Sequence, residues 1–320
     1  MKVSQNWVDI KKRRMKHRLW GIKSKWPIGR LIKEDCALYA RKHGYEFDIS
    51  NPVLFTEKLQ WYKLFYDHPD LSRIVDKREF KGYIREKLGD GHTLPLYGAW
   101  GDISGLKRQW GALPDTFVLK STVGSFGRNV LIIKDKKAAD FNVVKKELKK
   151  WLRPRNTLIN SFCRAYYGTA PGLIAERYEP QMESRTCDCK LFCFGGKPHI
   201  CQVQNWVKKG GAGSISTPGA SFEISFHDLG WRKIDAAYGP YKAGCPSKPK
   251  HFDEMLGIAE KLSKEFPFVR VDFFDTGEKP LIGEMTFYPG GGLIPFLPVE
   301  FNRSLGDLFI LPQLCQGDGG

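Results

Sequence analysis

The segment from Arg270 to Gly292 constrains the fold of this 320-residue chain more than any other stretch of its sequence. Two runs of strand-forming residues flank a polar, glycine-containing turn, a pattern that predicts a β-hairpin. With the turn centred near residue 278, Asp272 lies directly opposite Glu284. Because side chains alternate along a strand, Arg270 and Thr286 then share the face of these two acids. The hairpin therefore predicts a polar cluster on one face of a sheet.

Two acidic side chains that face each other repel unless a cation lies between them. Mg²⁺, held by a few carboxylate oxygens and by substrate phosphates, is the natural candidate for that cation. Arg270 beside the acids could bind a phosphoryl oxygen through its guanidinium. The alternative is a solvated hairpin face with a surface ion pair, and the hairpin alone does not decide between the two.

The composition is that of a folded globular protein, with 42% hydrophobic and 13% aromatic residues. No run of about 18 apolar residues is present, so we expect no transmembrane helix. The charged N-terminus lacks the apolar stretch of a secretory signal, and we therefore expect a cytoplasmic protein. The eight cysteines include no CxxC pair, which argues against a zinc site.

The formal net charge of +16 is concentrated in residues 1–33, where eleven lysines or arginines and one acid give +10. Apolar residues recur in this segment at helical spacing, at Val8, Met15, Leu19, Ile22 and Trp26. Such a basic amphipathic helix suits peripheral contact with an anionic membrane surface, and docking on the protein body is the alternative. Nothing resembling a zinc finger or an RNP motif supports nucleic-acid binding. Deletion of residues 1–30, followed by a membrane-partition measurement, tests the membrane hypothesis.

The predicted secondary structure changes near residue 93, from mostly helical to a mixture of strands and helices. Residues 34–92 show helical periodicity, including one helix from Leu71 to Leu88. Strand-forming runs follow, interspersed with helical segments, at residues 94–100, 117–120, 129–134, 172–178, 188–194 and 199–206. This mixture is typical of an α+β fold.

A glycine-rich stretch from Lys120 to Asn129 joins two of these strand-forming runs. Glycines let backbone N–H groups approach phosphate closely, and Lys120 could reach an α- or β-phosphate. Because the stretch joins two strands and no helix follows it, neither a Walker loop nor a dinucleotide fingerprint fits. A flap over nucleotide phosphates is the functional interpretation, and a plain hairpin loop is the alternative.

Two further strands carry charged residues near their ends. The strand that ends at Tyr178 could hydrogen-bond an adenine edge through its backbone, with an acid a few residues later on the ribose hydroxyls. Lys190 shares a strand face with Asp188 and could contact a phosphate or pair with an acid. Surface glutamates and an exposed ion pair are the plain alternatives.

Taken in this order, the motifs resemble the ATP-grasp superfamily, and in particular the TupA-like ATP-grasp family linked to teichuronopeptide and capsular polysaccharide synthesis. The resemblance covers roughly residues 50–315. It is carried by stretches spread along the chain, at Asn51–Trp61, Asp76-Lys77, Phe117–Asn129, Glu176–Tyr178, Asp188–Pro198, Arg270–Gly292 and Leu305–Leu308.

The resemblance implies an ATP-grasp fold, of the α+β class, in which two subdomains clasp ATP. Residues 106–176 with the glycine-rich flap form the first subdomain, and residues 177–320 with the hairpin form the second. The basic segment 1–33 and a short helical region at 34–105 precede them. This helical region replaces the Rossmann-like N-terminal domain of many ATP-grasp proteins, which leaves the acceptor-substrate site open.

The resemblance also implies roles for individual residues. Asp272 and Glu284 are the implied Mg²⁺ ligands, with Thr286 as a weaker ligand where many ATP-grasp ligases carry Asn. Arg270 and Lys190 are the candidate catalytic cations. The candidate nucleotide-binding residues, which include Glu183 as the ribose acid, are Lys77, Lys120, Ser121, Gly124, Ser125, Gly127, Glu176, Arg177, Tyr178, Glu179 and Glu183.

The activity that the resemblance implies is an ATP-dependent carboxylate–amine ligase, with ATP and Mg²⁺ as its cofactors. The carboxylate would belong to a uronic acid of an anionic surface polysaccharide or its precursor, and the amine to an amino acid or small amine. Three alternatives remain open from the residues. They are a glycosyltransferase of capsule biosynthesis, a small-molecule kinase on the same fold, and a non-catalytic binding protein with a degenerate nucleotide fold.

Overall fold

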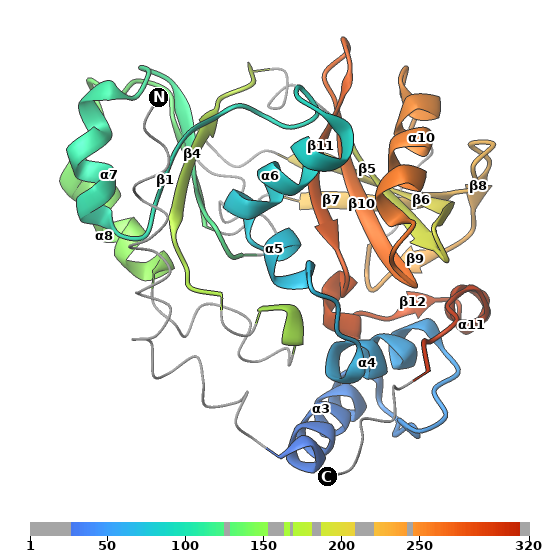
Figure 1. The fold of residues 1–320 in the computed structure, drawn as a ribbon. Helices are drawn as coiled ribbons and strands as arrows, with labels where there is room; N and C mark the ends of the chain where they lie inside the picture. The colour runs from blue at the N-terminus through green and yellow to red at the C-terminus, as the bar shows by residue number, and fades with distance from the viewer. Residues whose placement is uncertain are drawn as a thin grey trace.

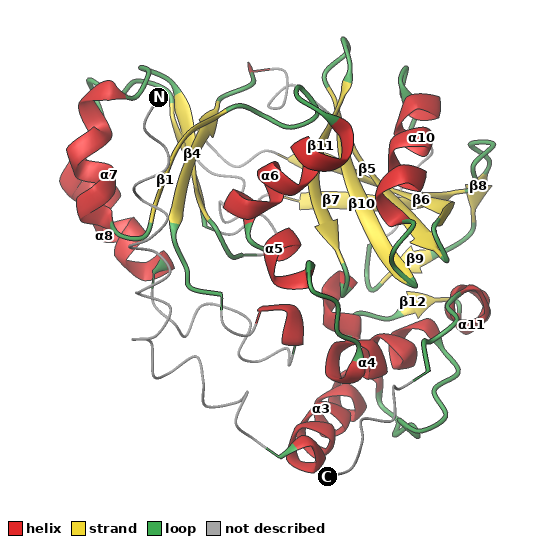
Figure 2. Ribbon diagram, viewed as in Figure 1, coloured by secondary structure: helices red, strands yellow, loops and turns green. Residues whose placement is uncertain are grey.

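The computed structural model describes residues 27–124, 129–152, 163–166, 169–180, 187–208, 221–241 and 246–313. Figure 1 shows the path of the chain, and Figure 2 shows its two larger β-sheets with helices around and between them. This mixture of helices and antiparallel strands confirms the α+β prediction.

The first sheet has four strands in the order β1-β4-β2-β3, and all its pairings are antiparallel. The strands are β1 (Leu96–Trp100), β2 (Phe117–Ser121), β3 (Val130–Ile133) and β4 (Leu173–Arg177). Helices α7 (Ile103–Gln109) and α8 (Phe141–Trp151) lie beside this sheet (Figure 1) and share a buried apolar cluster with it. Strand β1 comes from the predicted helical region 34–105 and pairs with β4, so this sheet crosses the predicted boundary at residue 106. The subdomain division itself stays a prediction.

The second sheet has six strands in the order β11-β10-β5-β6-β7-β8, again all antiparallel. Its strands are β5 (Cys187–Phe194), β6 (Lys197–Lys208), β7 (Ser221–His227), β8 (Lys233–Ile234), β10 (Phe268–Asp275) and β11 (Pro280–Thr286). Helix α10 (Phe252–Ser263) packs on one face of this sheet (Figure 1).

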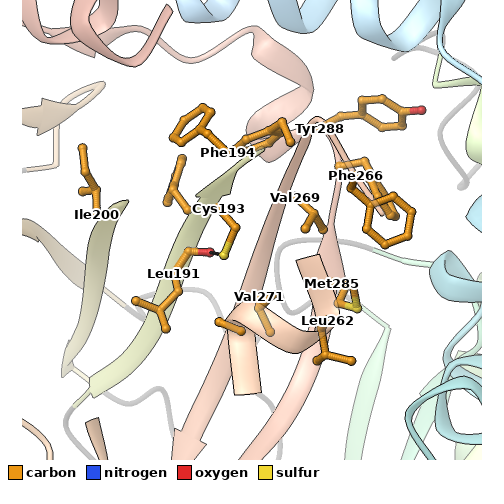
Figure 3. Close-up of a cluster of buried hydrophobic side chains, with 14 of the residues drawn as sticks. Leu191, Cys193, Phe194, Ile200, Leu262, Phe266, Val269, Val271, Met285 and Tyr288 are labelled. Carbon is orange, nitrogen blue, oxygen red and sulfur yellow. Dashed lines mark hydrogen bonds between the residues drawn. The ribbon is translucent and has the colours of Figure 1, made fainter. Parts of the chain in front are cut away.

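The side chains of β10 alternate between an apolar face and a polar face of the second sheet. Val269 and Val271 are fully buried and belong to the cluster that includes Leu262 of α10, as Figure 3 shows. Because side chains alternate along the strand, Arg270 and Asp272 point to the opposite face. The odd-numbered side chains therefore hold the sheet against α10, and the even-numbered ones are left for the site.

Two short helices, α5 (Leu71–Val75) and α6 (Lys77–Leu88), lie between the two sheets in Figure 1. The prediction of a single helix from Leu71 to Leu88 is wrong, because the helix breaks at Asp76. The backbone of Asp76 is extended, and its carboxylate accepts hydrogen bonds from the amides of Arg78 and Glu79 at 2.9 and 3.4 Å. An N-terminal cap of this kind starts a new helix, so Lys77 becomes the first residue of α6.

The 3₁₀ helix η1 (Trp110–Ala112) follows α7 and packs with the first sheet. The remaining elements cover the end of the second sheet. They are the helices α3 (Ile28–His43), α4 (Phe55–Phe65) and α11 (Val299–Leu308), the paired strands β9 (Ala237–Tyr238) and β12 (Phe296–Leu297), and the short 3₁₀ helices η3 (Arg164–Tyr166) and η4 (Pro289–Gly292). Phe55 of α4 contacts the rings of Phe192 and Phe268 at centroid distances of 6.1 and 5.0 Å. Phe192 is the register partner of Arg270, so these aromatic rings cover part of the same sheet face.

Several predictions fall outside the described residues and stay predictions. They concern most of the basic segment 1–33 and the candidate nucleotide residues Ser125, Gly127 and Glu183. Within the described part of the chain, no helix is both long enough and apolar enough to cross a membrane.

Candidate functional site

The hairpin formed by β10 and β11 has the register that the sequence predicts. Asp272 pairs with Glu284, and Arg270 pairs with Thr286. The turn closes through a hydrogen bond from the amide of Thr276 to the carbonyl of Lys279 at 3.1 Å. The predicted placement of the four polar side chains on one face is therefore confirmed.

Lys190 of β5 joins these four residues, because it is the register partner of Asp272 on the other side of β10. We call Arg270, Asp272, Glu284, Thr286 and Lys190 the hairpin cluster. Arg270 donates from Nε and Nη2 to the two carboxylate oxygens of Asp272 at 2.6 and 2.7 Å. Lys190 Nζ donates to Asp272 Oδ2 at 2.7 Å. Two cations thus hold one buried carboxylate.

Glu284 and Thr286 complete the cluster on its open side. Arg270 Nη2 lies 3.5 Å from Glu284 Oε1 and 3.3 Å from Thr286 Oγ1, and the Thr286 hydroxyl donates to Glu284 Oε1 at 3.2 Å. The side chain of Glu284 is 41% exposed, whereas that of Asp272 is 4% exposed. The cation between the two facing carboxylates is therefore Arg270 itself, and Glu284 remains accessible.

The charges around Asp272 keep it ionised despite its burial. Burial alone raises the pKa of this carboxyl group, but Arg270 and Lys190 outweigh that effect and hold the pKa below its ordinary value. The same pairing raises the pKa of Arg270 against the opposing effect of its burial. Both groups therefore stay charged at neutral pH.

The donor set of the hairpin cluster is chemically suited to Mg²⁺. A carboxylate offers about four lone pairs, and the three hydrogen bonds to Asp272 leave room for one more ligand bond. Glu284 is open, and Thr286 adds a hydroxyl oxygen. No group of three or more His, Cys, Asp or Glu side chains suited to a metal occurs among the described residues. A bound Mg²⁺ would therefore take its other ligands from phosphates and water, as this ion commonly does.

A second charged cluster lies between α6 and the first sheet. We call Lys77, Lys81, Lys120 and Glu176 the lysine cluster. The two oxygens of Glu176 pair with Lys81 at 2.7 Å and with Lys120 at 2.6 Å. Burial raises the pKa of Glu176, but the two ammonium groups outweigh it and lower the pKa to about 2. Glu176 is therefore a buried counter-ion that stays charged at neutral pH.

The break at Asp76 explains how α6 delivers its lysines to this place. The backbone amide of Lys77 donates to the carbonyl of Thr122 at 2.9 Å, and Lys77 Nζ donates to the carbonyl of Gly124 at 2.8 Å. Lys77 and Lys81 are one helical turn apart, so they lie on the same face of α6. The sequence reasoning found Lys77 and missed Lys81, although this spacing was the signal available.

The glycine-rich stretch joins β2 to β3, as predicted. The amide of Ser121 donates to the carbonyl of Asn129 at 3.1 Å, and Asn129 has a positive φ of 61°. Gly124 is held at the entrance of the loop by Lys77. Ser121 is buried at the end of β2. The roles of Ser121 and Gly124 toward phosphates stay predictions.

The predicted adenine segment begins at the end of β4. The side chain of Glu176 points to the lysines, whereas Arg177 and Glu179 form their own ion pair at 3.0 Å. Tyr178 lies between them, just after the strand ends. The Glu176 carboxylate thus belongs to the lysine cluster. Any contact of this segment with adenine through its backbone stays a prediction.

Lys77 links the two clusters. Burial lowers the pKa of its ammonium group, and the strongest opposing effect comes from the negative charge of Glu284. The open carboxylate of the hairpin cluster therefore lies within electrostatic reach of the lysine cluster.

Comparison with known protein families decides the family. The model of the family described as TupA-like ATPgrasp matches residues 57–310, which is most of the chain. The chain belongs to the TupA-like ATP-grasp family. The resemblance deduced from the motifs is thus confirmed, and with it the ATP-grasp fold.

Solved structures that are similar to this TupA-like protein share little sequence with it. D-alanine–D-alanine ligase from Bacillus anthracis is 15% identical, with a TM-score of 0.43 over 79% of this chain and 72% of that chain. D-alanyl-alanine synthetase A from Vibrio cholerae is 14% identical, with a TM-score of 0.42 over 70% and 59%. N5-carboxyaminoimidazole synthetase from Staphylococcus aureus, complexed with ADP, is 12% identical, with a TM-score of 0.36 over 67% and 44%.

The TupA-like chain therefore spans less than two thirds of the length of the last two proteins. The comparison with curated proteins gives no match. Membership of an ATP-grasp family supports the class of ATP-dependent ligase for this protein.

Proposed function

We propose that this protein is an ATP-dependent carboxylate–amine ligase that acts on a uronic acid of a surface polysaccharide or its precursor. The observation that carries the proposal is the pair of charged clusters, which lie within electrostatic reach of each other because the charge of Glu284 acts on Lys77. The lysine cluster has three ammonium groups for one carboxylate, which suits a polyphosphate. The hairpin cluster has two cations and two carboxylates, which suits a phosphoryl group bound together with Mg²⁺.

The reaction needs alignment and charge stabilisation more than a protein nucleophile. A substrate carboxylate oxygen attacks the γ-phosphorus of ATP, the bond from that phosphorus to the bridging oxygen breaks, and ADP leaves. The product is an acyl phosphate. The amine then attacks the acyl carbon, loses a proton, and expels phosphate to leave an amide.

The residues of the two clusters fit these steps. Lys77 and Lys120 bind the phosphates, and Arg270 stabilises the negative charge that develops on the transferred phosphoryl group. Lys190 keeps Asp272 charged and in place. Asp272, Glu284 and Thr286 would hold Mg²⁺, which when bound neutralises phosphate charge.

The hexuronic acid and the amine follow from the family resemblance and from the charge of the chain. Residues 1–33 contribute +10 of the net charge, and an anionic polymer or membrane surface would be attracted to them. The protein would then meet its polymeric substrate at the inner face of a membrane.

Nucleotide binding measured by thermal shift tests the proposal. We expect ATP with Mg²⁺ to raise the melting temperature of the wild type, and Glu284→Gln to weaken that stabilisation because it removes an open metal ligand. Glu278→Gln is the matched control, since Glu278 lies exposed in the turn of the same hairpin. This control should respond to ATP like the wild type.

The competing functions predict different results. Stabilisation by UDP-sugars and none by ATP would contradict the ligase and favour a glycosyltransferase. A stable phosphorylated sugar, formed in the presence of amines and with no amide, would show a kinase instead. Release of phosphate that requires both a uronate and an amine would support the ligase.

A further inference from the structure

Two buried polar side chains beside the hairpin cluster have a polar atom without a hydrogen-bond partner among the described residues. They are Gln202 of β6, which is 2% exposed, with its Oε1, and Tyr238 of β9, which is 5% exposed, with its hydroxyl. Buried polar groups are almost always hydrogen-bonded, so each such group calls for an explanation. Their shared location near one site suggests a common one.

The position of Gln202 follows from the strand register. Asp272 of β10 pairs with Lys190 of β5, and Lys190 pairs with Gln202 of β6. Residues that pair across antiparallel strands share a face of the sheet. Gln202 therefore continues the polar row of the hairpin cluster, directly beside Lys190.

Tyr238 reaches the same face from the short strand β9. Its ring contacts Phe296 at a centroid distance of 4.8 Å, and Phe296 contacts Phe192 at 6.0 Å. Phe192 is the register partner of Arg270, so Tyr238 stands over the aromatic end of the hairpin cluster. The charges of Arg270 and Asp272 also act on the Tyr238 hydroxyl.

The Tyr238 hydroxyl also touches the segment that follows β11. A Cβ atom on Gly290 would collide with it, and Gly290 has a φ of 59°, a conformation that favours glycine. Gly290 comes four residues after Thr286 of the hairpin cluster. The absence of a side chain at residue 290 is therefore what leaves room for the phenol hydroxyl at this place.

We propose that Gln202 and Tyr238 form a subsite that recognises hydroxyl groups of the carboxylate substrate. Gln202 Oε1 can only accept a hydrogen bond, so it needs a donor such as an alcohol, while the Tyr238 hydroxyl can donate or accept. Arg270 and Lys190 supply the positive charge for the carboxylate or phosphoryl group. The ligand class that satisfies all four is a polyhydroxylated carboxylic acid.

This inference rests on the proposed function and adds a source of substrate specificity to it. A substrate without hydroxyl groups would bury the same two polar atoms and leave them unpaired. Sites built to hydrogen-bond a substrate hydroxyl discriminate strongly against analogues that lack it. Gln202 and Tyr238 would therefore select sugar acids from other carboxylates.

Binding of two ring carboxylates, D-glucuronate and cyclohexanecarboxylate, tests the subsite. Titration calorimetry in the presence of ADP and Mg²⁺ should show that the wild type binds D-glucuronate at least tenfold more tightly. Tyr238→Phe and Gln202→Leu should each reduce that ratio by about tenfold, the loss of one hydrogen bond. Neither change should lower the melting temperature, because each removes an atom that has no hydrogen-bond partner in the part of the chain that the structure describes.

Tyr83→Phe is the matched control. Among the described residues the Tyr83 hydroxyl is also buried without a hydrogen-bond partner. Its ring contacts Arg73 and Lys87, which belong to neither cluster. This variant should keep the wild-type ratio of the two affinities.

Three results would overturn the subsite. They are equal binding of the two acids by the wild type, an unchanged ratio in both variants, and binding of neither acid while ADP still binds. A fall in melting temperature with an unchanged ratio would mean that the two groups hold internal waters. Failure of ADP itself to bind would instead count against the proposed function.

Discussion

The lysine cluster and the hairpin cluster are built around the same kind of ion pair but differ in net charge. In each, two cations hold one buried carboxylate, at 2.6 and 2.7 Å for Glu176 and at 2.6 to 2.7 Å for Asp272. The lysine cluster has Lys77 in addition and is left with an excess of positive charge. The hairpin cluster has Glu284 in addition and is balanced. The first cluster is therefore ready for an anion, and the second needs a cation and an anion together.

The two clusters also differ in how far apart their members lie in the sequence. Most of the hairpin cluster comes from two adjacent strands, whereas the lysine cluster joins α6, β2 and β4. We expect substitutions in the hairpin cluster to damage the chemical step, and substitutions in the lysine cluster to damage nucleotide binding and stability.

The largest expected effect is on turnover in the hairpin cluster. We expect Arg270→Lys to lower kcat by about 10²–10³-fold, because lysine cannot replace the two-pronged contact of a guanidinium at a charged transition state. ATP affinity should change little. The measurement is steady-state phosphate release with the carboxylate that the wild type accepts.

The control for this change is Arg232→Lys, which alters an exposed arginine paired with Asp228. It should keep wild-type turnover. If Arg270→Lys raised only the KM for ATP and left kcat unchanged, the two clusters would not divide chemistry and nucleotide binding between them.

The next largest effect is on stability in the lysine cluster. We expect Glu176→Gln to lower the free energy of unfolding by about 3 kcal/mol at neutral pH, because it leaves Lys81 and Lys120 without their counter-ion. Urea denaturation measures this. Glu86→Gln, which breaks an exposed pair with Arg73, should leave the free energy of unfolding nearly unchanged.

The pH dependence of this difference gives an independent check. The pKa of Glu176 is about 2 in the folded protein and about 4.3 in an unfolded chain. A depressed carboxyl pKa stabilises the fold fully above the unfolded value, and this stabilisation is lost as pH falls toward the folded value. The stability gap between wild type and Glu176→Gln should therefore shrink between about pH 4.5 and pH 2. A constant gap would mean that charge does not cause it.

The smallest effect concerns Lys81, which no motif marked. Without Lys81, Glu176 would hold Lys120 alone and make it less available to phosphate. We expect Lys81→Met to raise the KM for ATP by about tenfold with a smaller change in kcat, and Lys81→Arg to restore most of the loss. Lys87→Met, which removes an exposed lysine from the same helix, should leave both constants unchanged.

The outcome for Lys81 separates two roles. A fall in stability with an unchanged KM for ATP would make Lys81 a structural partner of Glu176 and nothing more. A raised KM at unchanged stability would make it a positioning residue for Lys120.

The sequence predicted best what lies close together along the chain. The register of Asp272 and Glu284 follows from one turn, and Lys190 was found because its strand carries a recognisable motif. The helix break at Asp76 was missed, because the helical periodicity continues through it. The Asp-x-x-Glu spacing to Glu79 is the capping pattern that could have revealed the break.

Contacts between distant segments were out of reach. Lys81 and Glu176 belong to different elements, and no local pattern pairs them. Gln202 and Tyr238 are neutral residues, and they stand out only because each buries a polar atom without a hydrogen-bond partner among the described residues. Single-sequence reasoning weighs charged residues and glycines, so it passes over such groups.

The capped start of α6 makes the site sensitive to chain length. An α-helix turns by about 100° per residue, so one residue inserted between Lys77 and Lys81 would rotate Lys81 away from Glu176 while Lys77 stayed in place. Every original side chain would still be present, and only the count of residues would have changed. A one-residue insertion in this turn should therefore damage the site more than many point substitutions do. Engineered variants of the protein should keep the number of residues in this turn unchanged.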